Sequence, residues 1–316
     1  MSHPCIFIQG PTATGKSQLA MDLASIMGAS ILNADSIQLY EGLQIGSAAP
    51  SKDEKEKVPH HLFQVIPKGE TWTASQYEQT AWELLQKELV LRPVLVVGGS
   101  GFYFSALEKG MGDSKPEDPG VRAQLEEDLK TRGADQLHKE LSECDPEAAA
   151  KIHPQDHYRL LRSLGYFRTY GRKMSEDQKL KSVREWPGPL IKVGFWATRE
   201  QLEPVVRARV EKMNALGFEK EVESLLKEGL ESWWPLQSVG YKEWVEVLQG
   251  DLSRDSVVDA IVKSTLYLAK RQKTWFQRDK DLKWFSMDQK DQAFNWVLEE
   301  CGLDLKARKL KDEGQS

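Results

Sequence analysis

Short apolar runs alternate with longer amphipathic segments along most of the chain. Four runs have the length and composition of buried strands: residues 5–9, 30–34, 94–97 and 192–197. Three segments carry apolar residues at helical spacing: residues 17–27, 75–91 and 200–227. Because strands that alternate with helices build parallel sheets, the pattern predicts an α/β fold with helices on both faces of one sheet.

Residues 110–189 interrupt this alternation. They are charged and nearly free of apolar runs, and their spacing predicts helices at 118–131, 134–144 and 156–170. We therefore predict a core made of residues 1–109 and 190–300, with the part beyond residue 205 mainly helical and with a helical insertion at 110–189. The polar residues 301–316 are predicted to form a fraying tail.

Composition and charge exclude several classes of protein. The 43 basic and 48 acidic side chains give a formal net charge of −5, which excludes a uniformly basic nucleic-acid binder but allows a local basic patch. No apolar run reaches the length of a membrane span, and no signal peptide precedes the first strand. Cys5, Cys144 and Cys301 lie far apart, without metal-ligand spacing, which indicates a reducing compartment. We expect a cytoplasmic protein without a membrane partner.

The first strand-to-helix connection has the pattern G-x-x-x-x-G-K-S. Its residues are Gly10, Pro11, Thr12, Ala13, Thr14, Gly15, Lys16 and Ser17. In such a P-loop the backbone N–H groups surround a phosphate, Lys16 reaches the terminal phosphate and Ser17 binds Mg²⁺. The strand before it and the helix after it favour a phosphate site over a chance turn. The pattern predicts a P-loop NTPase-like sheet, but it fits ATP, another nucleotide or another diphosphate ester equally well.

Polar and glycine-rich segments follow two further strands. Asp35 comes directly after the second strand, where it is suited either to act as a general base beside the phosphates or to cap a helix. Gly98, Gly99 and Gly101 surround Ser100 after the third strand, and they allow either close approach of a ligand or a plain tight turn. The adjacent histidines at 60–61 lack further ligands at suitable spacing, so a metal site is not predicted there.

Two runs combine cations with aromatic residues. Residues 157–174 carry five cations and no acid, and residues 267–280 carry five cations and one acid, so the net charges are +5 and 5 − 1 = +4. This composition suits a folded RNA, in which phosphates are neutralised and bases stack, although a solvated helix face is the alternative. Arg209, after the fourth strand, either clamps phosphate oxygens or forms a surface ion pair with Glu203 or Glu211.

Several separated motifs, in order along nearly the whole chain, resemble the bacterial tRNA dimethylallyltransferases, also called tRNA isopentenyltransferases. Besides the phosphate loop, the matching segments are residues 35–40, 45–50, 59–62, 98–103, 240–243 and 269–276. The chain departs from the family pattern at Gly165, where glutamate is usual, at Leu266, where a cation is frequent, and at Gln277, which displaces an arginine.

The resemblance implies that the enzyme transfers a dimethylallyl group from dimethylallyl diphosphate to N6 of adenosine 37, which has to leave the stacked anticodon loop of tRNA. It implies that Asp35 is the general base and that Lys16, Ser17 with Mg²⁺ and Arg209 stabilise the leaving diphosphate. We expect a monomer. The expected tRNA contacts are Asp35, Ser36, Ile37, Gln38, Ser100, Gly101, Arg122, Tyr158, Arg159, Leu160, Leu161, Arg162, Gln237, Ser238, Val239, Gly240, Tyr241, Lys242, Lys270, Arg271, Gln272 and Trp275.

Three other functions share parts of this pattern. A small-molecule kinase would use the same phosphate loop and Asp35, and an adenine-nucleotide isopentenyltransferase would carry out related chemistry on a free nucleotide. Both leave the insertion and the basic runs unexplained. A nucleotide-gated RNA-binding protein would need the basic runs but no general base.

Overall fold

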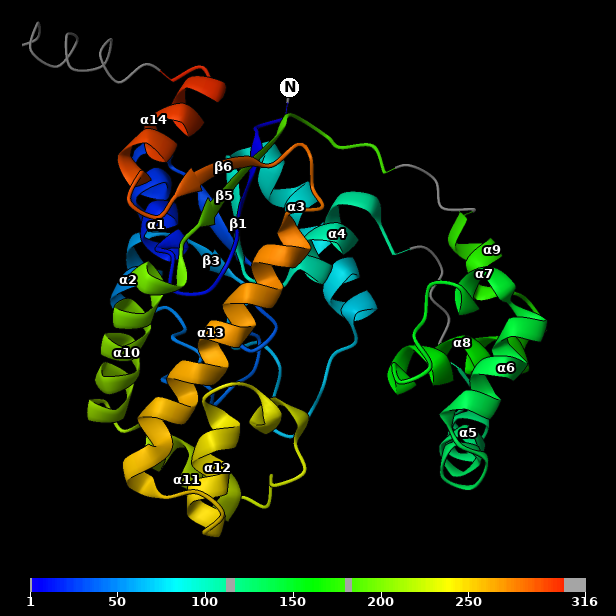
Figure 1. Ribbon diagram of the computed structural model, residues 1–316. Helices are drawn as coiled ribbons and strands as arrows, with labels where there is room; N and C mark the ends of the chain where they lie inside the picture. The colour runs from blue at the N-terminus through cyan, green and yellow to red at the C-terminus, as the bar shows by residue number, and fades with distance from the viewer. Residues whose placement is uncertain (1, 112–116, 180–183, 304–316) are drawn as a thin grey trace, which may run out of the picture. The chain divides into compact units, whose positions relative to one another are not determined.

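The computed structural model describes residues 2–111, 117–179 and 184–303. The chain divides into two compact units (Figure 1). The core unit comprises Met1–Glu108 with Glu185–Ser316, and the insertion unit is Lys109–Arg184. The pattern of apolar residues predicts 110–189 for this insertion.

The core unit contains one sheet of six parallel strands in the order β3-β2-β4-β1-β5-β6. Its strands are β1 (Cys5–Gln9), β2 (Ser30–Asn33), β3 (His60–His61), β4 (Val94–Gly98), β5 (Leu190–Trp196) and β6 (Lys283–Ser286). The predicted α/β fold is confirmed. The edge strands β3 and β6 escape sequence-based prediction because neither contains a continuous apolar run.

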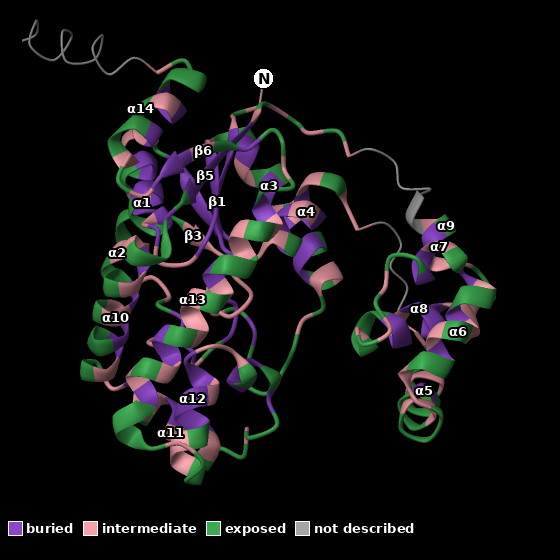
Figure 2. Cartoon of the chain, viewed as in Figure 1, coloured by how far each residue is buried: buried purple, intermediate pink, exposed green. Residues whose placement is uncertain are grey.

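Alternate residues of each central strand pack on opposite faces of the sheet, as the pleat requires. Phe7 and Val96 belong to the cluster that also includes helices α3 (Ala74–Leu91) and α4 (Gly101–Lys109). Ile8 belongs to the cluster with α1 (Lys16–Met27) and α14 (Lys290–Glu300). Figure 1 shows these helix pairs on opposite sides of the sheet, and Figure 2 shows that the strands between them are buried. Burial on both faces explains why the strands have continuous apolar sequences.

Four longer helices follow β5 and extend the core unit beyond the carboxyl ends of the strands. They are α10 (Arg199–Ala215), α11 (Phe218–Lys227), α12 (Tyr241–Gln249) and α13 (Val257–Phe276). The single helix predicted at 200–227 is therefore wrong, because Gly217, with φ of 100°, adopts a left-handed conformation that ends α10 and starts α11. Shorter elements are α2 (Lys52–Lys57), η1 (Trp234–Gln237) and η2 (Arg254–Ser256).

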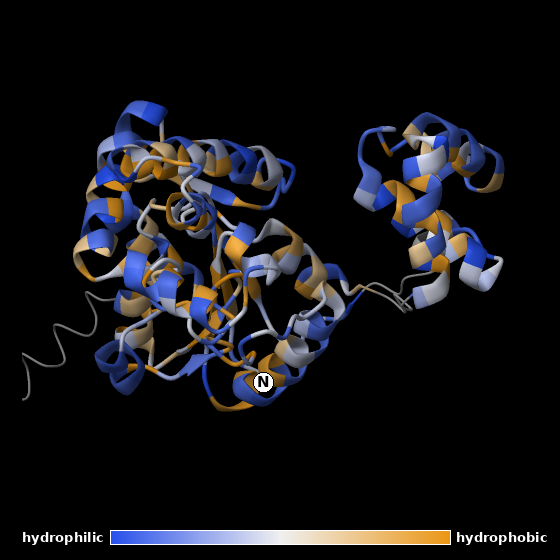
Figure 3. Cartoon of the chain, turned by 90° about the horizontal axis from the view of Figure 1, so that it is seen from below, coloured by the Kyte–Doolittle hydropathy of each residue, from blue (hydrophilic) through white to orange (hydrophobic). Residues whose placement is uncertain are grey.

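The insertion unit has its own small hydrophobic core. Its helices are α5 (Pro119–Arg132), α6 (Ala134–Cys144), α7 (Pro146–Ala149), α8 (His157–Tyr170) and α9 (Met174–Lys179). Leu125, Leu141 and Leu164 are fully buried in this core, and Figure 3 shows apolar and polar residues alternating along its helices. The buried Asp145 caps α7 through Ala148 N and also accepts from Ser175 N, so one carboxylate joins α7 to α9.

No helix within the described ranges combines the length and the apolar character that crossing a bilayer requires. The predicted tail, from residue 304 onward, lies outside the described residues.

A test of the sheet concerns Gly98, at the carboxyl end of β4. A methyl group there would lie 2.0 Å from the carbonyl oxygen of Ala34, which is backbone and cannot move aside. We expect Gly98→Ala to lower the free energy of unfolding by about 3 kcal/mol. The matched control is Gly28→Ala, at a left-handed position with open space around it. This change should lower the free energy of unfolding by about 1–2 kcal/mol. Equal losses in denaturant unfolding would contradict the close approach.

Candidate active site

The predicted site segments meet at one edge of the sheet. Because β1, β2, β4 and β5 are parallel neighbours, their carboxyl ends lie together. The segments that follow these strands are the phosphate loop, the turn at Asp35, the glycine-rich turn at 99–101 and helix α10. Segments nearly 200 residues apart in sequence thus form one site.

The phosphate loop is shaped by backbone contacts before any ligand binds. Gly10 has φ of 134°, and a side chain there would lie 2.7 Å from the carbonyl oxygen of Phe195. Thr14 Oγ1 donates to the carbonyl of Pro11 at 2.9 Å, and Lys16 Nζ donates to the same oxygen at 2.5 Å. The loop therefore has the curl that points backbone N–H groups inward at the start of α1.

A glutamine on α13 joins the phosphate loop to the glycine-rich turn. Thr12 N donates to Gln272 Oε1 at 2.8 Å, and Gln272 Nε2 donates to the carbonyl of Gly99 at 3.0 Å. Both ends of this amide are thus used inside the core unit. Gln272 is among the predicted tRNA contacts, and in the structure its side chain positions two loops of the site.

Asp35 lies in a turn that its neighbour Asn33 organises. Asn33 Oδ1 accepts from Asp35 N at 2.8 Å, and Asp35 Oδ1 accepts from Ile37 N at 2.9 Å. No helix follows, so the helix-cap alternative is wrong and one carboxylate oxygen instead closes a local turn. Within the described chain the other oxygen has no hydrogen-bond partner, and the half-buried residue lines a cavity.

The side chains of Lys16 and Arg209 both lie near the carboxylate of Asp35. Arg209 Nη1 donates to Thr12 Oγ1 at 3.4 Å, which brings α10 to the phosphate loop. Burial lowers the pKa of Arg209, and the negative charge of Asp35 opposes this shift. Burial likewise lowers the pKa of Lys16 to about 7, again with opposition from Asp35. Positive charge held out of water with few carboxylates near it is suited to an anionic ligand.

The structure decides against the predicted surface ion pair of Arg209 with Glu203 or Glu211. Neither carboxylate lies within ion-pair distance of it in the described chain. The neighbouring Arg207 instead pairs with Asp259 at 2.8 Å. Arg209 therefore stays available for phosphate oxygens.

A cavity of about 120 Å³ opens beside Asp35. Its polar lining includes Thr12, Asp35 and Arg209, and its apolar lining comes largely from Val206, Val210, Met213, Phe218, Ile261 and Leu268. A larger hollow of about 390 Å³ lies between the loop at 42–45 and α11, but no residue of the phosphate loop lines it. The smaller cavity thus combines an anion-binding end with an apolar compartment.

A clamp on α11 fixes one wall of the cavity. Glu221 accepts from three successive backbone N–H groups, those of Gln44, Ile45 and Gly46, at 3.0, 2.7 and 3.1 Å. Tyr241 OH donates to Glu221 Oε1 at 2.8 Å and accepts from Ser47 N at 3.2 Å. No local pattern signals this clamp, since its partners are about 175 residues apart.

Tyr241, one of the predicted tRNA contacts, is fully buried and holds this wall of the cavity. The neighbouring residues that are also predicted to contact tRNA differ in how far they are exposed. Gln237 is exposed, and Ser238, Val239 and Gly240 line the cavity. Lys242 is partly exposed and lies 3.5 Å from Glu243.

The segment after Asp35 is tied to the loops around it. Ser36 N donates to Ser100 Oγ at 3.0 Å, which joins the Asp35 turn to the glycine-rich turn. Gln38 Nε2 donates to the carbonyl of Ser47 at 2.9 Å, and Ile37 lines the cavity. Of these predicted tRNA contacts, Ile37 lines the cavity and the others connect the loops beside it.

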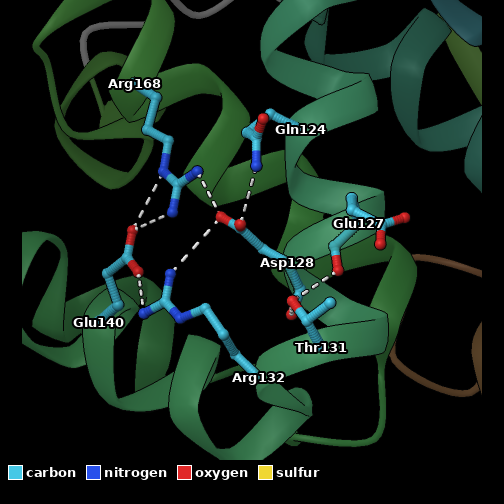
Figure 4. Close-up of polar contacts among 7 residues, drawn as sticks. All are labelled: Gln124, Glu127, Asp128, Thr131, Arg132, Glu140 and Arg168. Atoms are coloured by element: carbon cyan, nitrogen blue, oxygen red, sulfur yellow. Dashed lines mark hydrogen bonds and ion pairs between the residues drawn. The ribbon is translucent and has the colours of Figure 1, made fainter.

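The basic run of the insertion unit serves partly to hold that unit together. Arg168 bonds Asp128 at 2.8 Å and Glu140 at 2.6 Å, and Arg132 reaches the same two carboxylates (Figure 4). The count of +5 therefore overstates the free charge of residues 157–174. Leu160 and Leu161, which belong to the segment predicted to contact tRNA, have side chains buried in the hydrophobic core of the insertion unit.

Other predicted contacts of the insertion unit also have partners within it. Arg122 pairs with Glu117 and Glu126, and Arg159 lies 3.4 Å from Asp156. Tyr158 is 72% exposed and so remains accessible, and Arg162 has polar interactions inside the protein.

The basic run on α13 forms an exposed surface beside the glycine-rich turn. We call it the α13 surface, and it consists of the exposed residues Phe102, Tyr267, Lys270, Arg271 and Arg278 and the partly buried Trp275. The Arg278 guanidinium lies 5.4 Å from the Trp275 ring centre, and Arg271 lies 6.0 Å from that of Tyr267. A methyl group on Gly101 would lie 2.0 Å from Trp275. Glycine therefore lets this aromatic ring approach the turn at the site.

The two histidines of β3 contact neighbouring groups of the core unit. His60 Nδ1 bonds the carbonyl of Val58 at 2.8 Å, and His61 Nε2 lies 3.5 Å from Glu88. Within the described residues no group of three or more His, Cys, Asp or Glu side chains is placed to hold a metal ion.

The hydrogen bonds that Glu221 accepts can be tested by substitution. Glu221→Gln replaces a carboxylate oxygen by an NH₂ group that cannot accept, so buried N–H groups lose their partner. We expect the free energy of unfolding to fall by about 1–3 kcal/mol and the amides of residues 44–47 to exchange faster with solvent. The control is Glu223→Gln on the same helix. Glu223 forms an exposed ion pair with Lys227, so this change should lower the free energy of unfolding by less than about 1 kcal/mol. Equal effects of the two changes would contradict the clamp.

Comparison with known proteins places these features in a family. The family model described as IPP transferase matches residues 38–279. The chain is 46% identical over 283 residues to a tRNA dimethylallyltransferase of Bdellovibrio bacteriovorus, covering 89% of this chain and 92% of that protein. It is 39% identical to one of Geobacter sulfurreducens, covering 88% and 90%.

Solved structures agree with this assignment. The full-length tRNA isopentenylpyrophosphate transferase of Bacillus halodurans superposes with a TM-score of 0.69 at 28% identity, covering 98% of this chain and 99% of that one. A eukaryotic dimethylallyltransferase, crystallised while acting on tRNA, shares the fold with a TM-score of 0.76 at 23% identity, covering 90% and 74%. The chain belongs to the IPP transferase family of prenyl-transferring enzymes, together with the tRNA dimethylallyltransferases.

Proposed function

We propose that this enzyme transfers the dimethylallyl group of dimethylallyl diphosphate to N6 of adenosine 37 in tRNAs that read codons starting with U. The products are N6-isopentenyladenosine and diphosphate. One observation carries the proposal: a single cavity joins Thr12 of the phosphate loop, the Arg209 cation and the Asp35 carboxylate to an apolar compartment. A kinase site requires no such compartment next to the phosphates.

The polar end of the cavity suits the diphosphate. Backbone N–H groups at the start of α1 provide a site for phosphate oxygens, and Lys16 and Arg209 lie close to the same loop. Charge grows on the diphosphate as its bond to carbon breaks, and fixed cations in a partly buried site stabilise that charge. Lys16 would exchange its bond to the Pro11 carbonyl for a phosphate oxygen.

We propose Mg²⁺ as the cofactor, held by Ser17. The hydroxyl of Ser17 is exposed at the start of α1 and has no hydrogen-bond partner among the described residues. Mg²⁺ prefers oxygen ligands, keeps several waters and binds with substrate phosphates instead of in an all-protein cage, so a lone hydroxyl beside the phosphate loop fits it. When bound, the ion would neutralise charge on the leaving diphosphate.

Asp35 is placed to accept a proton from the attacking amine. The lone pair of adenine N6 is delocalised into the ring, so the amine is a weak nucleophile. In the proposed step the N6–C1 bond forms, the C1–O bond to diphosphate breaks, and one N6 proton passes to the free oxygen of Asp35. The other Asp35 oxygen keeps its bond to Ile37 N and holds the carboxylate in place.

The α13 surface is the proposed contact for the anticodon arm. Its cations are suited to phosphates and its exposed rings to unstacked bases. It adjoins the glycine-rich turn, which Ser100 joins to the turn of Asp35, so we propose that an adenosine leaving the stack reaches Asp35 from this side. We further propose that the enzyme acts as a monomer in the cytoplasm.

The experiment that tests the function is incubation with labelled dimethylallyl diphosphate and unmodified tRNA, followed by nucleoside mass spectrometry. We expect label in N6-isopentenyladenosine at position 37. Label on free adenine nucleotides instead would favour the nucleotide isopentenyltransferase, and ATP hydrolysis without label transfer would favour a kinase. If the protein binds tRNA but shows none of these reactions, the result would favour a nucleotide-gated RNA-binding protein.

Replacing Asp35 tests the general base. Asp35→Asn keeps the shape and the turn but cannot take a proton, so we expect kcat to fall by roughly 10²–10⁴-fold while the Kd for tRNA changes little. Asp251→Asn, at an exposed position, serves as the control and should leave kcat unchanged. An unchanged kcat in single-turnover assays of the Asp35 variant would contradict its role.

Neutralising two cations tests the α13 surface. Lys270→Gln with Arg271→Gln should weaken tRNA binding and lower the slope of log K against log salt by about 0.9 for each phosphate left without a cation. The control is Lys227→Gln on α11, which pairs with Glu223. An unchanged slope, measured by filter binding at several salt concentrations, would mean that the α13 surface is only a solvated face.

A further inference from the structure

The residues of α10 that line the cavity form a row from its polar end to its far end. Val206 and Val210 are four residues apart, as are Arg209 and Met213, and all four residues line the cavity from one side of α10. Arg209 reaches Thr12 of the phosphate loop. Met213 comes one turn later, about 6 Å farther along the helix axis and farther from β5, where α10 begins. A prenyl diphosphate held by the phosphate loop would therefore point its tail toward Met213.

The wall beyond Met213 is rigid. The Phe218 and Tyr241 rings meet edge to face at 5.0 Å, and both side chains are buried. A methyl group on Gly46 would lie 2.1 Å from Phe218, so the backbone of Gly46 lies directly against that ring. Because Tyr241 is in turn held by Glu221, Phe218 cannot turn aside to admit a longer ligand.

Met213 is the side chain whose substitution would change the length of this end of the cavity. It is the one methionine among the lining residues and is 8% exposed. The cavity of about 120 Å³ compares with an apolar protein cavity of about 150 Å³ that accommodates the six carbons of benzene. By this comparison the space is of the size that a five-carbon tail requires and is small for a ten-carbon tail.

We propose that Met213, supported by Phe218, limits the prenyl donor to five carbons and so excludes geranyl diphosphate. This inference rests on the proposed prenyl transfer, and it assigns a specificity-determining role to a residue that takes no part in the chemistry. Shortening Met213 should lengthen the compartment without disturbing Arg209, Asp35 or the phosphate loop.

The experiment compares Met213→Ala with the wild-type enzyme on dimethylallyl and geranyl diphosphate, with the same tRNA. We expect the ratio of kcat/KM for geranyl to that for dimethylallyl diphosphate to rise at least about tenfold, since methylene-sized differences in an apolar pocket discriminate by 10–200-fold. Two controls should keep the wild-type ratio: Met213→Leu, which conserves volume, and Val205→Ala, at a position of α10 that is 41% exposed and outside the cavity.

The outcomes separate this inference from the function on which it rests. Transfer of neither donor by folded wild-type enzyme would overturn the proposed function. Dimethylallyl transfer by Met213→Ala with an unchanged donor ratio would overturn the role of Met213. If Met213→Ala fails to fold, Met213→Phe tests the same wall by filling it: KM for dimethylallyl diphosphate should rise while KM for tRNA stays constant, and an unchanged donor KM would overturn the inference.

Discussion

The structure depends on the parallel pairing of four central strands, which brings their carboxyl ends to one edge. At this edge the backbone is packed against backbone: Gly98 lies against the Ala34 carbonyl, and Gly10 lies against the Phe195 carbonyl. Side chains at these positions would push the strand ends apart. The close packing therefore fixes the distance between the phosphate loop, Asp35 and α10, and the cavity exists because those segments converge there.

A second layer of polar side chains holds the loops that the strands bring together. Gln272 joins the phosphate loop to the glycine-rich turn, Asn33 shapes the turn of Asp35, and Glu221 clamps the loop at 44–46. In each case a side chain satisfies backbone groups of an irregular segment. This arrangement leaves one oxygen of Asp35, the Arg209 guanidinium and the inner N–H groups of the phosphate loop available to substrate. The net charge of −5 conceals this local concentration of positive charge.

The sequence predicts those parts of the fold that local patterns encode. The apolar runs at β1, β2, β4 and β5 are recognisable because these strands are buried on both faces, and the phosphate loop is recognisable because its chemistry requires a fixed spacing. The edge strands β3 and β6 lack such runs, and the break at Gly217 looks like any glycine in a helical segment. Topology identifies Asp35 as a site residue, but its helix-cap alternative can be rejected only from the backbone that follows it.

Local sequence patterns do not reveal contacts between residues that lie far apart along the chain. Tyr241 and Gln272 belong to matching motifs, which suggest RNA contacts, yet both side chains are used inside the core unit. Arg168 counts as free charge in the sequence because its partners Asp128 and Glu140 lie 40 and 28 residues away. Conversely, the contact of Arg209 with Thr12 spans 197 residues; the position of Arg209 after the fourth strand makes it a candidate for phosphate binding but leaves the surface ion pair open.

The central claim is that the phosphate loop and the cavity beside Asp35 together hold the prenyl donor. The most direct measurement is a crystal structure with Mg²⁺ and dimethylallyl thiodiphosphate, a donor analogue that resists bond cleavage. The account predicts the thiodiphosphate within the loop at 10–17 and in contact with Arg209, with the prenyl tail between α10 and Phe218. A donor bound in the larger hollow beside α11, or a tail directed away from α10, would contradict it.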